Sequence, residues 1–143
     1  MGKVEKIMLK EFLLRKNGML SKFCQYVELE SLSFDVVELK TVEQKAKELI
    51  NDDSFAELYH VYIGEILIRN ILGGYWEIDN LKRDPAYHKP IILSNVDKNM
   101  MRLCPIVDWF GLLKKGYFQE GISGHVGKVI RSQKRRMNEN SSL

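Results

Sequence analysis

The sequence predicts an α+β fold, with four to five helices around a central buried helix (residues 54–72) and a small antiparallel β-meander. Three observations support this prediction. The segment 54–72 is almost entirely apolar and shows no wide polar face at about 100° per residue, so the rest of the domain must surround it. Helical periodicity with capping residues precedes it. After Gly74 the pattern changes to short apolar segments separated by turn residues, which indicates strands.

The length of 143 residues and the hydrophobic content of 45% are ordinary for a single globular domain. We assign residues 1–133 to this domain and residues 134–143 to a basic, then polar, C-terminal tail. Cys24 and Cys104 match no metal-binding spacing. No apolar run approaches the roughly 18 residues of a membrane span, and the N-terminal segment lacks the hydrophobic core of a secretory signal. We therefore expect a cytoplasmic protein with reduced thiols and no membrane partner.

The N-terminal third predicts two clear helices and a short helical segment between them. Residues 3–16 form an amphipathic pattern that Asn17-Gly18 should end. Residues 19–34 are apolar without a clean period, which fits a short helix that runs into an extended segment. Asp35 and Glu38 have the spacing of a capping box, so a second helix should begin there and end near Ile50.

The central helix carries a start signal and a stop signal. Ser54 is expected to cap its first turn, and Glu57 stands where a capping box requires an acid. Gly73-Gly74 should end it in the left-handed conformation. The connection of only three residues, 51–53, predicts that this helix packs against the preceding one as an antiparallel hairpin.

The sequence predicts specific roles for four residues inside the central helix. Glu65 and Arg69 are one turn apart and should form an ion pair. Gly64 destabilises a helix by about 1 kcal/mol relative to alanine, so we expect it to admit a close neighbour. His60 has no second ligand at metal-binding spacing, which predicts a surface histidine or one with satisfied hydrogen bonds.

The C-terminal half predicts three strands followed by two helices. The strands are expected at 75–79, 90–94 and 100–103. A proline-led helix should follow over 105–115, and a last helix over 121–133.

No pattern in the sequence predicts catalysis. It contains no phosphate-binding glycine loop, no zinc-protease helix and no nucleophile elbow. His60, His88 and His125 fall on three separate predicted elements. We therefore expect a non-enzymatic protein with no cofactor and no bound metal.

Charge is unevenly distributed along the chain. The formal net charge of +3 is too small to indicate nucleic-acid binding. Residues 1–16 carry five basic residues against two acids, and residues 111–143 carry seven against two. Residues 28–57 carry nine acids against three lysines, a net charge of −6. These charges predict either solvated helix faces that pair with each other or a charged docking surface.

The segment 62–76 carries the motif Y-x-G-E-x-x-x-R-N-x-x-G-G-x-W. This motif resembles that of small uncharacterised bacterial α+β proteins, in which such a helix leads into a strand, a proline-led strand and a proline-led helix. Pro90 and Pro105 stand where that outline places prolines, whereas Leu72 is an extra residue before the double glycine. The resemblance covers roughly residues 33–116. Proteins of this kind are similar to toxin-immunity proteins, which implies a protein that blocks a cognate toxin and has no catalytic residues.

Under this hypothesis, acidic residues of the 28–57 segment would contact the toxin by mimicking its nucleic-acid or phosphate partner. The candidate contacts are Asp35, Glu38, Glu43, Asp52 and Asp53. Three aromatic residues, Tyr75, Trp76 and Trp109, could either anchor a partner or pack in the core.

Two alternatives remain open. A nucleic-acid-associated accessory protein could use the basic residues near the C-terminus, which are Lys128, Arg131, Lys134, Arg135 and Arg136. The acidic segment would repel a phosphate backbone, so nucleic acid is the less favoured partner. A subunit of a larger assembly would instead use the apolar segment 19–34 if that segment were exposed.

Overall fold

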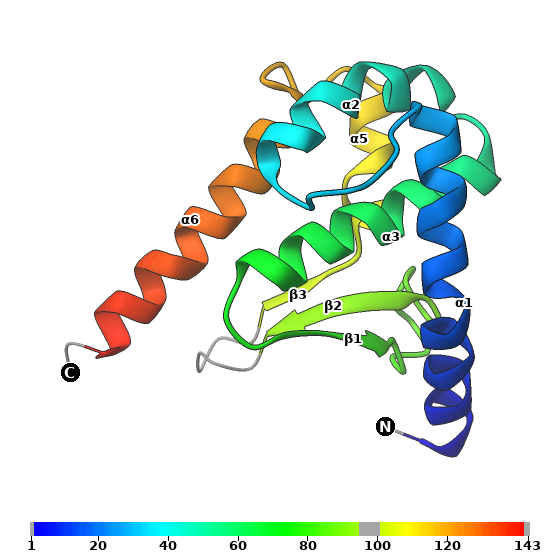
Figure 1. The fold of residues 1–143 in the computed structure, drawn as a ribbon. Helices are drawn as coiled ribbons and strands as arrows, with labels where there is room; N and C mark the ends of the chain where they lie inside the picture. The colour runs from blue at the N-terminus through cyan, green and yellow to red at the C-terminus, as the bar shows by residue number, and fades with distance from the viewer. Residues whose placement is uncertain (1, 95–100, 142–143) are drawn as a thin grey trace.

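A computed structural model describes residues 2–94 and 101–141. Its helices are α1 (Lys3–Val27), α2 (Val36–Leu49), α3 (Asp53–Asn70), α4 (Pro105–Asp108), α5 (Phe110–Lys114) and α6 (Gly121–Ser141). Its strands are β1 (Gly74–Ile78), β2 (Pro90–Ser94) and β3 (Met101–Leu103). Figure 1 shows α3 between α2 and the sheet, with α1 packed against α3 and β1. The predicted α+β class is confirmed.

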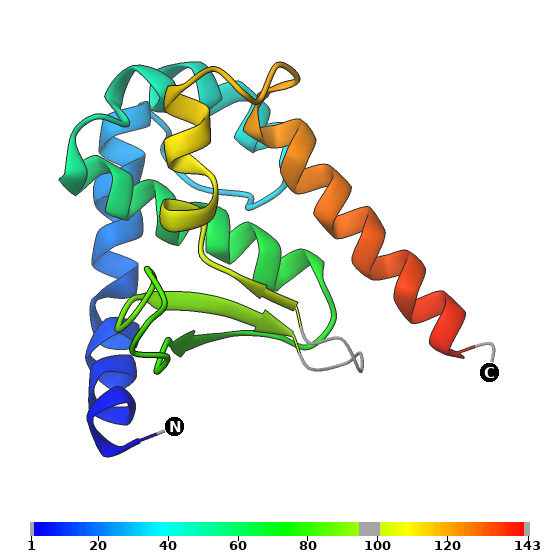
Figure 2. The same cartoon turned by 180° about the vertical axis from the view of Figure 1, so that it is seen from behind.

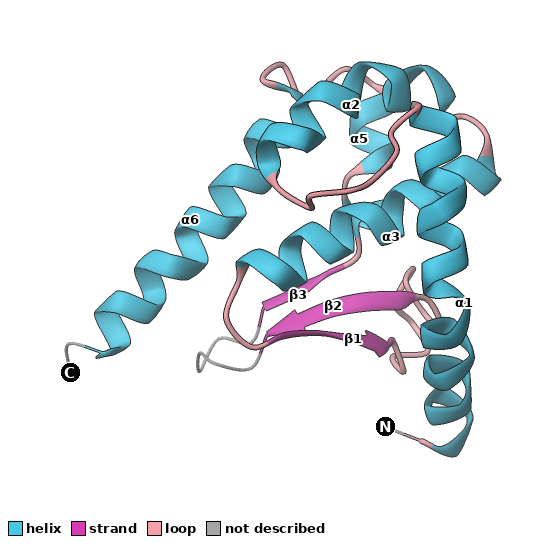
Figure 3. Ribbon diagram, viewed as in Figure 1, coloured by secondary structure: helices cyan, strands magenta, loops and turns pink. Residues whose placement is uncertain are grey.

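The sheet is an antiparallel meander in the order β1-β2-β3, as predicted (Figure 3). Trp76 pairs with Ile92 in β1–β2, and Ile92 pairs with Leu103 in β2–β3. The strand β2 has the predicted bounds. Met100, which the prediction placed at the start of the third strand, lies outside the described residues.

Helix α3 is the centre of the core, as its lack of a polar face predicted. Every residue from Val61 to Leu67 is buried. Aromatic rings stack against it from other helices: the Phe23 ring of α1 lies 4.3 Å from that of Tyr62, and the Phe110 ring of α5 lies 5.3 Å from that of Tyr59. A helix with apolar side chains all round is stable in water only when it is enclosed in this way.

The prediction that Asn17-Gly18 ends the first helix is wrong, because α1 continues to Val27. Leu20 and Phe23 are buried on the same face as Phe12. Their burial stabilises the helix by roughly 1.5–3 kcal/mol per side chain, which exceeds the penalty of about 1 kcal/mol for Gly18. The chain then leaves the helix through Glu28, whose φ is 61°.

The start of α3 also differs from the prediction. The capping residue is Asp52, whose Oδ1 accepts hydrogen bonds from the backbone N–H groups of Ser54 (2.9 Å) and Phe55 (3.3 Å). Ser54 therefore lies inside the first turn rather than at the cap. At the other end, α3 ends at Asn70 and the chain leaves it through Ile71 in an extended conformation, so the helix stops before the predicted end at 72. Gly73 adopts a φ of 71°, but it does so in the turn that leads to β1 rather than at the helix end.

Two further boundaries near the C-terminus differ. The predicted helix over 105–115 is interrupted at Trp109, whose φ of −120° separates α4 from α5. Trp109 contacts His125 of α6, whereas Phe110 stacks on Tyr59 of α3, so the break allows neighbouring aromatic side chains to reach different elements. Helix α6 continues to Ser141, beyond the predicted end at 133, because the basic residues that follow favour helix.

Candidate functional site

The helix-to-strand motif over 62–76 is the first candidate, and its glycine has a packing role. A Cβ atom on Gly64 would overlap the ring of Trp76, so only glycine lets β1 approach α3 this closely. Trp76 in turn meets the Phe12 ring edge-on at 5.0 Å. The close approach predicted for Gly64 is confirmed.

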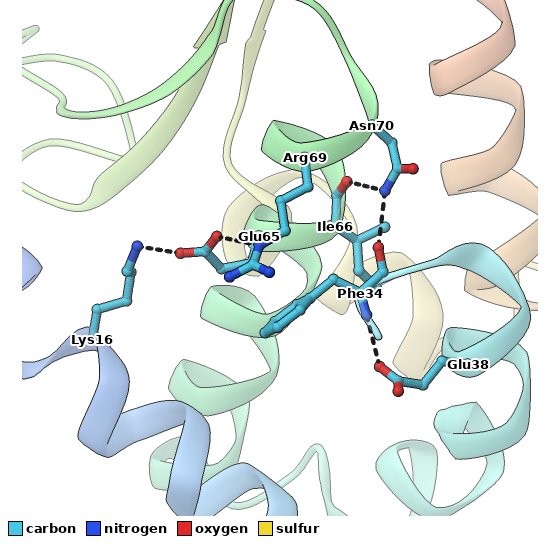
Figure 4. A network of polar contacts seen from close by, with 7 residues as sticks. All are labelled: Lys16, Phe34, Glu38, Glu65, Ile66, Arg69 and Asn70. Atoms are coloured by element: carbon cyan, nitrogen blue, oxygen red, sulfur yellow. Dashed lines mark hydrogen bonds and ion pairs between the residues drawn. The ribbon is translucent and has the colours of Figure 1, made fainter. Parts of the chain in front are cut away.

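The acid and the base of the motif form the predicted ion pair inside a larger network (Figure 4). Arg69 Nε lies 3.3 Å from Glu65 Oε2, and Lys16 of α1 pairs with Glu65 Oε1. The guanidinium carbon of Arg69 lies 3.7 Å from the centroid of the Phe34 ring. A carboxylate with only 4% of its side chain exposed therefore has two cationic partners, as a buried charge requires.

Two further motif residues position the loop that precedes α2. Asn70 Nδ2 donates hydrogen bonds to the carbonyl oxygens of Phe34 (2.9 Å) and Ile66 (2.7 Å). The hydroxyl of Tyr62 donates to Glu38 Oε1 at 2.9 Å. The motif residues are therefore occupied by contacts within the fold. They explain how α3 joins α1, α2 and β1.

The candidate contact residues at the start of α2 hold that helix in place. Asp35 Oδ1 accepts from the N–H of Glu38 at 2.7 Å, and this hydrogen bond lowers the pKa of Asp35. Glu38 accepts from the N–H groups of Ser33 (2.7 Å) and Phe34 (3.2 Å). The predicted capping residue is confirmed, although Glu38 reaches the two residues before Asp35 rather than Asp35 itself.

Glu43 connects α2 to α6. Its Oε2 accepts a hydrogen bond from the N–H of Ser123 at 3.0 Å, in the first turn of α6. This carboxylate thus satisfies a backbone donor at a helix N-terminus, where negative charge is favoured. Substitution of Glu43 would disturb the packing of two helices as well as any surface role.

Asp52 and Asp53 lie together at the turn between α2 and α3, and both are exposed. At about 1.5 Å per residue, the 14-residue α2 separates them from Asp35 by roughly 20 Å. The structure therefore divides the predicted acidic residues into two groups. The exposed Glu48 joins the second group, and we call Glu48, Asp52 and Asp53 the acidic corner.

The structure places an exposed aromatic residue close to the first turn of α3. Tyr26 of α1 is 43% exposed, and its ring lies 5.5 Å from that of Phe55 in the first turn of α3. Residues 19–34 gave no clear helix face, so the sequence did not indicate this position. Trp76 and Trp109, by contrast, are buried, which confirms core packing for both, and Tyr75 is half-buried.

The predicted basic residues line an exposed face of α6. The residues Lys128, Arg131, Lys134, Arg135 and Arg136 are all exposed. Lys128 pairs with Glu120 at 3.0 Å. Figures 1 and 2 show the C-terminal half of α6 extending away from the other helices, at the end of the molecule opposite the α2–α3 turn.

His60 is buried and has satisfied hydrogen bonds, as one of the two predictions for it stated. Its Nε2–H donates to the Pro90 carbonyl at 2.8 Å, and its Nδ1 accepts from the N–H of Ile106 at 3.2 Å. These two bonds require the neutral ring with the proton on Nε2. Burial lowers the pKa of His60 to about 4, so the ring is neutral at physiological pH.

Among the described residues, no group of three or more His, Cys, Asp or Glu side chains is arranged to hold a metal ion. Within the same residues, no helix combines the length and apolar character that crossing a bilayer requires. Comparisons of the chain with protein-family models, with curated proteins and with solved structures found no significant match.

Proposed function

We propose that this chain is a non-enzymatic, immunity-type binding protein of the bacterial cytoplasm, which neutralises a cognate protein toxin by occluding its surface. The proposal starts from the resemblance carried by the segment 62–76. The observation that supports it most is the acidic corner at the α2–α3 turn, together with the exposed ring of Tyr26, which contacts Phe55 in the first turn of α3.

The acidic corner has the composition of a docking surface. Tyrosine is enriched among the residues that dominate binding energy, because its ring covers a large area at low entropic cost. Carboxylates around such an anchor accelerate association with a basic partner and exclude acidic ones. A toxin that acts on nucleic acid or phosphate has a basic active surface, which this corner would cover.

The exposed carboxylates and the half-buried carboxylates that bind backbone groups of this chain have different roles in this proposal. Asp52 and Asp53 keep their predicted role as contacts, with Glu48 added. Asp35, Glu38 and Glu43 also stay predicted contacts, but each already binds backbone groups of its own chain. A test of binding should therefore use Asp53, which caps no helix.

The experiment is affinity capture from cells of the source organism with the tagged protein, together with expression of the neighbouring reading frame. We expect one stoichiometric protein partner that is toxic when expressed alone and harmless when co-expressed with this chain. A captured protein that is not toxic would contradict the immunity role.

The basic face of α6 favours a second candidate, a nucleic-acid-associated accessory protein. Its exposed cations project away from the body on a continuous helix, so a phosphate backbone could reach them. The test is replacement of Arg131, Lys134, Arg135 and Arg136 by glutamine, which leaves the buried residues of α6 intact. A salt-dependent interaction with DNA or RNA in the native protein should then disappear. If the native protein binds neither, this candidate is excluded.

A further inference from the structure

A cavity of about 210 Å³ opens between α1, α3 and the start of β2. Its apolar walls are Phe12 and Met19 of α1, Val61 of α3 and Ile106 of α4. An apolar protein cavity of about 150 Å³ is known to hold benzene. The cavity therefore has room for a group the size of an aromatic ring, and its lining combines these apolar side chains with charged ones.

The charged groups that line the cavity carry an excess of one positive charge. Arg15 and Lys89 are exposed cations, and neither has an ion-pair or side-chain hydrogen-bond partner within residues 2–94 and 101–141. Glu57 supplies one carboxylate, and His88 is directed to Glu5 at 3.7 Å. This excess attracts an anion, and a bound monoanion leaves the charged groups of the cavity neutral overall.

His60 lies at the inner end of the cavity, but its ring has no nitrogen free to bind a ligand. Both ring nitrogens are occupied, by the Pro90 carbonyl and the Ile106 N–H. The charged end of a ligand would therefore lie at the exposed cations, and its apolar end would point inward. This is the usual arrangement of a small-molecule site, with apolar walls and a few polar groups that orient the ligand.

We propose that this cavity binds a small monocarboxylate with an apolar body about the size of an aromatic ring, its carboxylate between Arg15 and Lys89. This site is separate from the acidic corner and does not depend on the proposed toxin partner. A charge-assisted hydrogen bond from either cation accounts for a preference for the carboxylate over a neutral isostere.

The test is an NMR titration of the full chain with phenylacetate, compared with the uncharged phenylacetamide. We expect phenylacetate to cause saturable shifts of the backbone N–H signals of His60, Val61 and Lys89. Phenylacetamide should bind about tenfold more weakly than phenylacetate. Arg15→Gln should lower phenylacetate affinity by about tenfold. Glu57→Gln should raise it, because a like charge is removed.

Lys22→Gln is the matched control, since Lys22 is an exposed cation on the same helix that does not line the cavity. Its phenylacetate affinity should equal that of the native protein. The proposal is overturned if phenylacetate causes no saturable shift at the cavity residues. Equal affinities for the two ligands, or for Arg15→Gln and Lys22→Gln, would overturn it as well. Circular dichroism establishes that each variant is folded.

Discussion

Single residues of the 62–76 motif have roles that the structure makes specific. Gly64 admits the ring of Trp76, Glu65 pairs with two cations, and Asn70 fixes the loop before α2. The groups that make these contacts are therefore not available to bind a partner. The motif residues thus determine how the chain folds, and the contacts that we propose with a partner lie on other surfaces.

Alanine substitution at two glycines should have opposite effects on stability. Gly64→Ala should destabilise the protein by about 2 kcal/mol, because the new methyl group overlaps the Trp76 ring and overpacking outweighs the gain in helix propensity. Gly18→Ala should stabilise it by up to about 1 kcal/mol, because no atom lies within 4 Å of the added Cβ. Urea denaturation of both variants measures this, and an unaffected Gly64→Ala protein would contradict the packing described.

His60 should make stability depend on pH. Its pKa is about 4 in the folded chain and 6.5 when exposed, so the unfolded chain binds a proton more readily between these values. The free energy of unfolding should therefore fall as the pH is lowered from 6.5 to 4, by up to about 3 kcal/mol from this residue. The contribution is fully present above pH 6.5.

Denaturation of the native protein and of His60→Gln across this pH range measures the effect. The difference in unfolding free energy between the two should be constant from pH 7 to 8. It should shrink as the pH is lowered from 6.5 to 4. A constant difference over the whole range would show that His60 is not buried as described.

At the scale of elements, Asp52 caps the start of α3, whereas the sequence predicted that Ser54 does so. Asp52→Ala should destabilise the protein by about 1 kcal/mol, because two N–H groups lose their acceptor. Ser54→Ala should change stability by less than about 0.5 kcal/mol, because its side chain is exposed within the first turn. Chemical denaturation of the two variants decides between the two possible caps. A larger loss of unfolding free energy for Ser54→Ala than for Asp52→Ala would favour the serine cap.

The elements could be predicted where local signals and burial agree. The start of α2 at Asp35, the core position of α3 and the bounds of β2 all follow from capping, periodicity and proline. The continuation of α1 through Gly18 could not be predicted, because it depends on packing of Phe23 against α3. The acidic character of the candidate site could be predicted from the sequence. Its division into two groups could not, because it depends on how α2 separates the residues at its two ends.

At the scale of the whole molecule, two exposed groups of opposite charge lie at opposite ends. The acidic corner lies at the α2–α3 turn, and the basic face of α6 projects from the other end (Figures 1 and 2). Such a distribution orients a charged partner before contact. A basic partner would approach the acidic corner, whereas an acidic partner would approach α6.

We propose that the acidic corner binds the toxin, and a comparison of two charge-reversal variants tests this. The affinity of the captured toxin is measured for Asp53→Lys and for Glu11→Lys. Both substitutions reverse one exposed carboxylate, but Glu11 lies on α1 outside the corner. We expect a loss of about tenfold or more for Asp53→Lys and an unchanged affinity for Glu11→Lys, with both variants folded. Equal affinities for the two variants would contradict it.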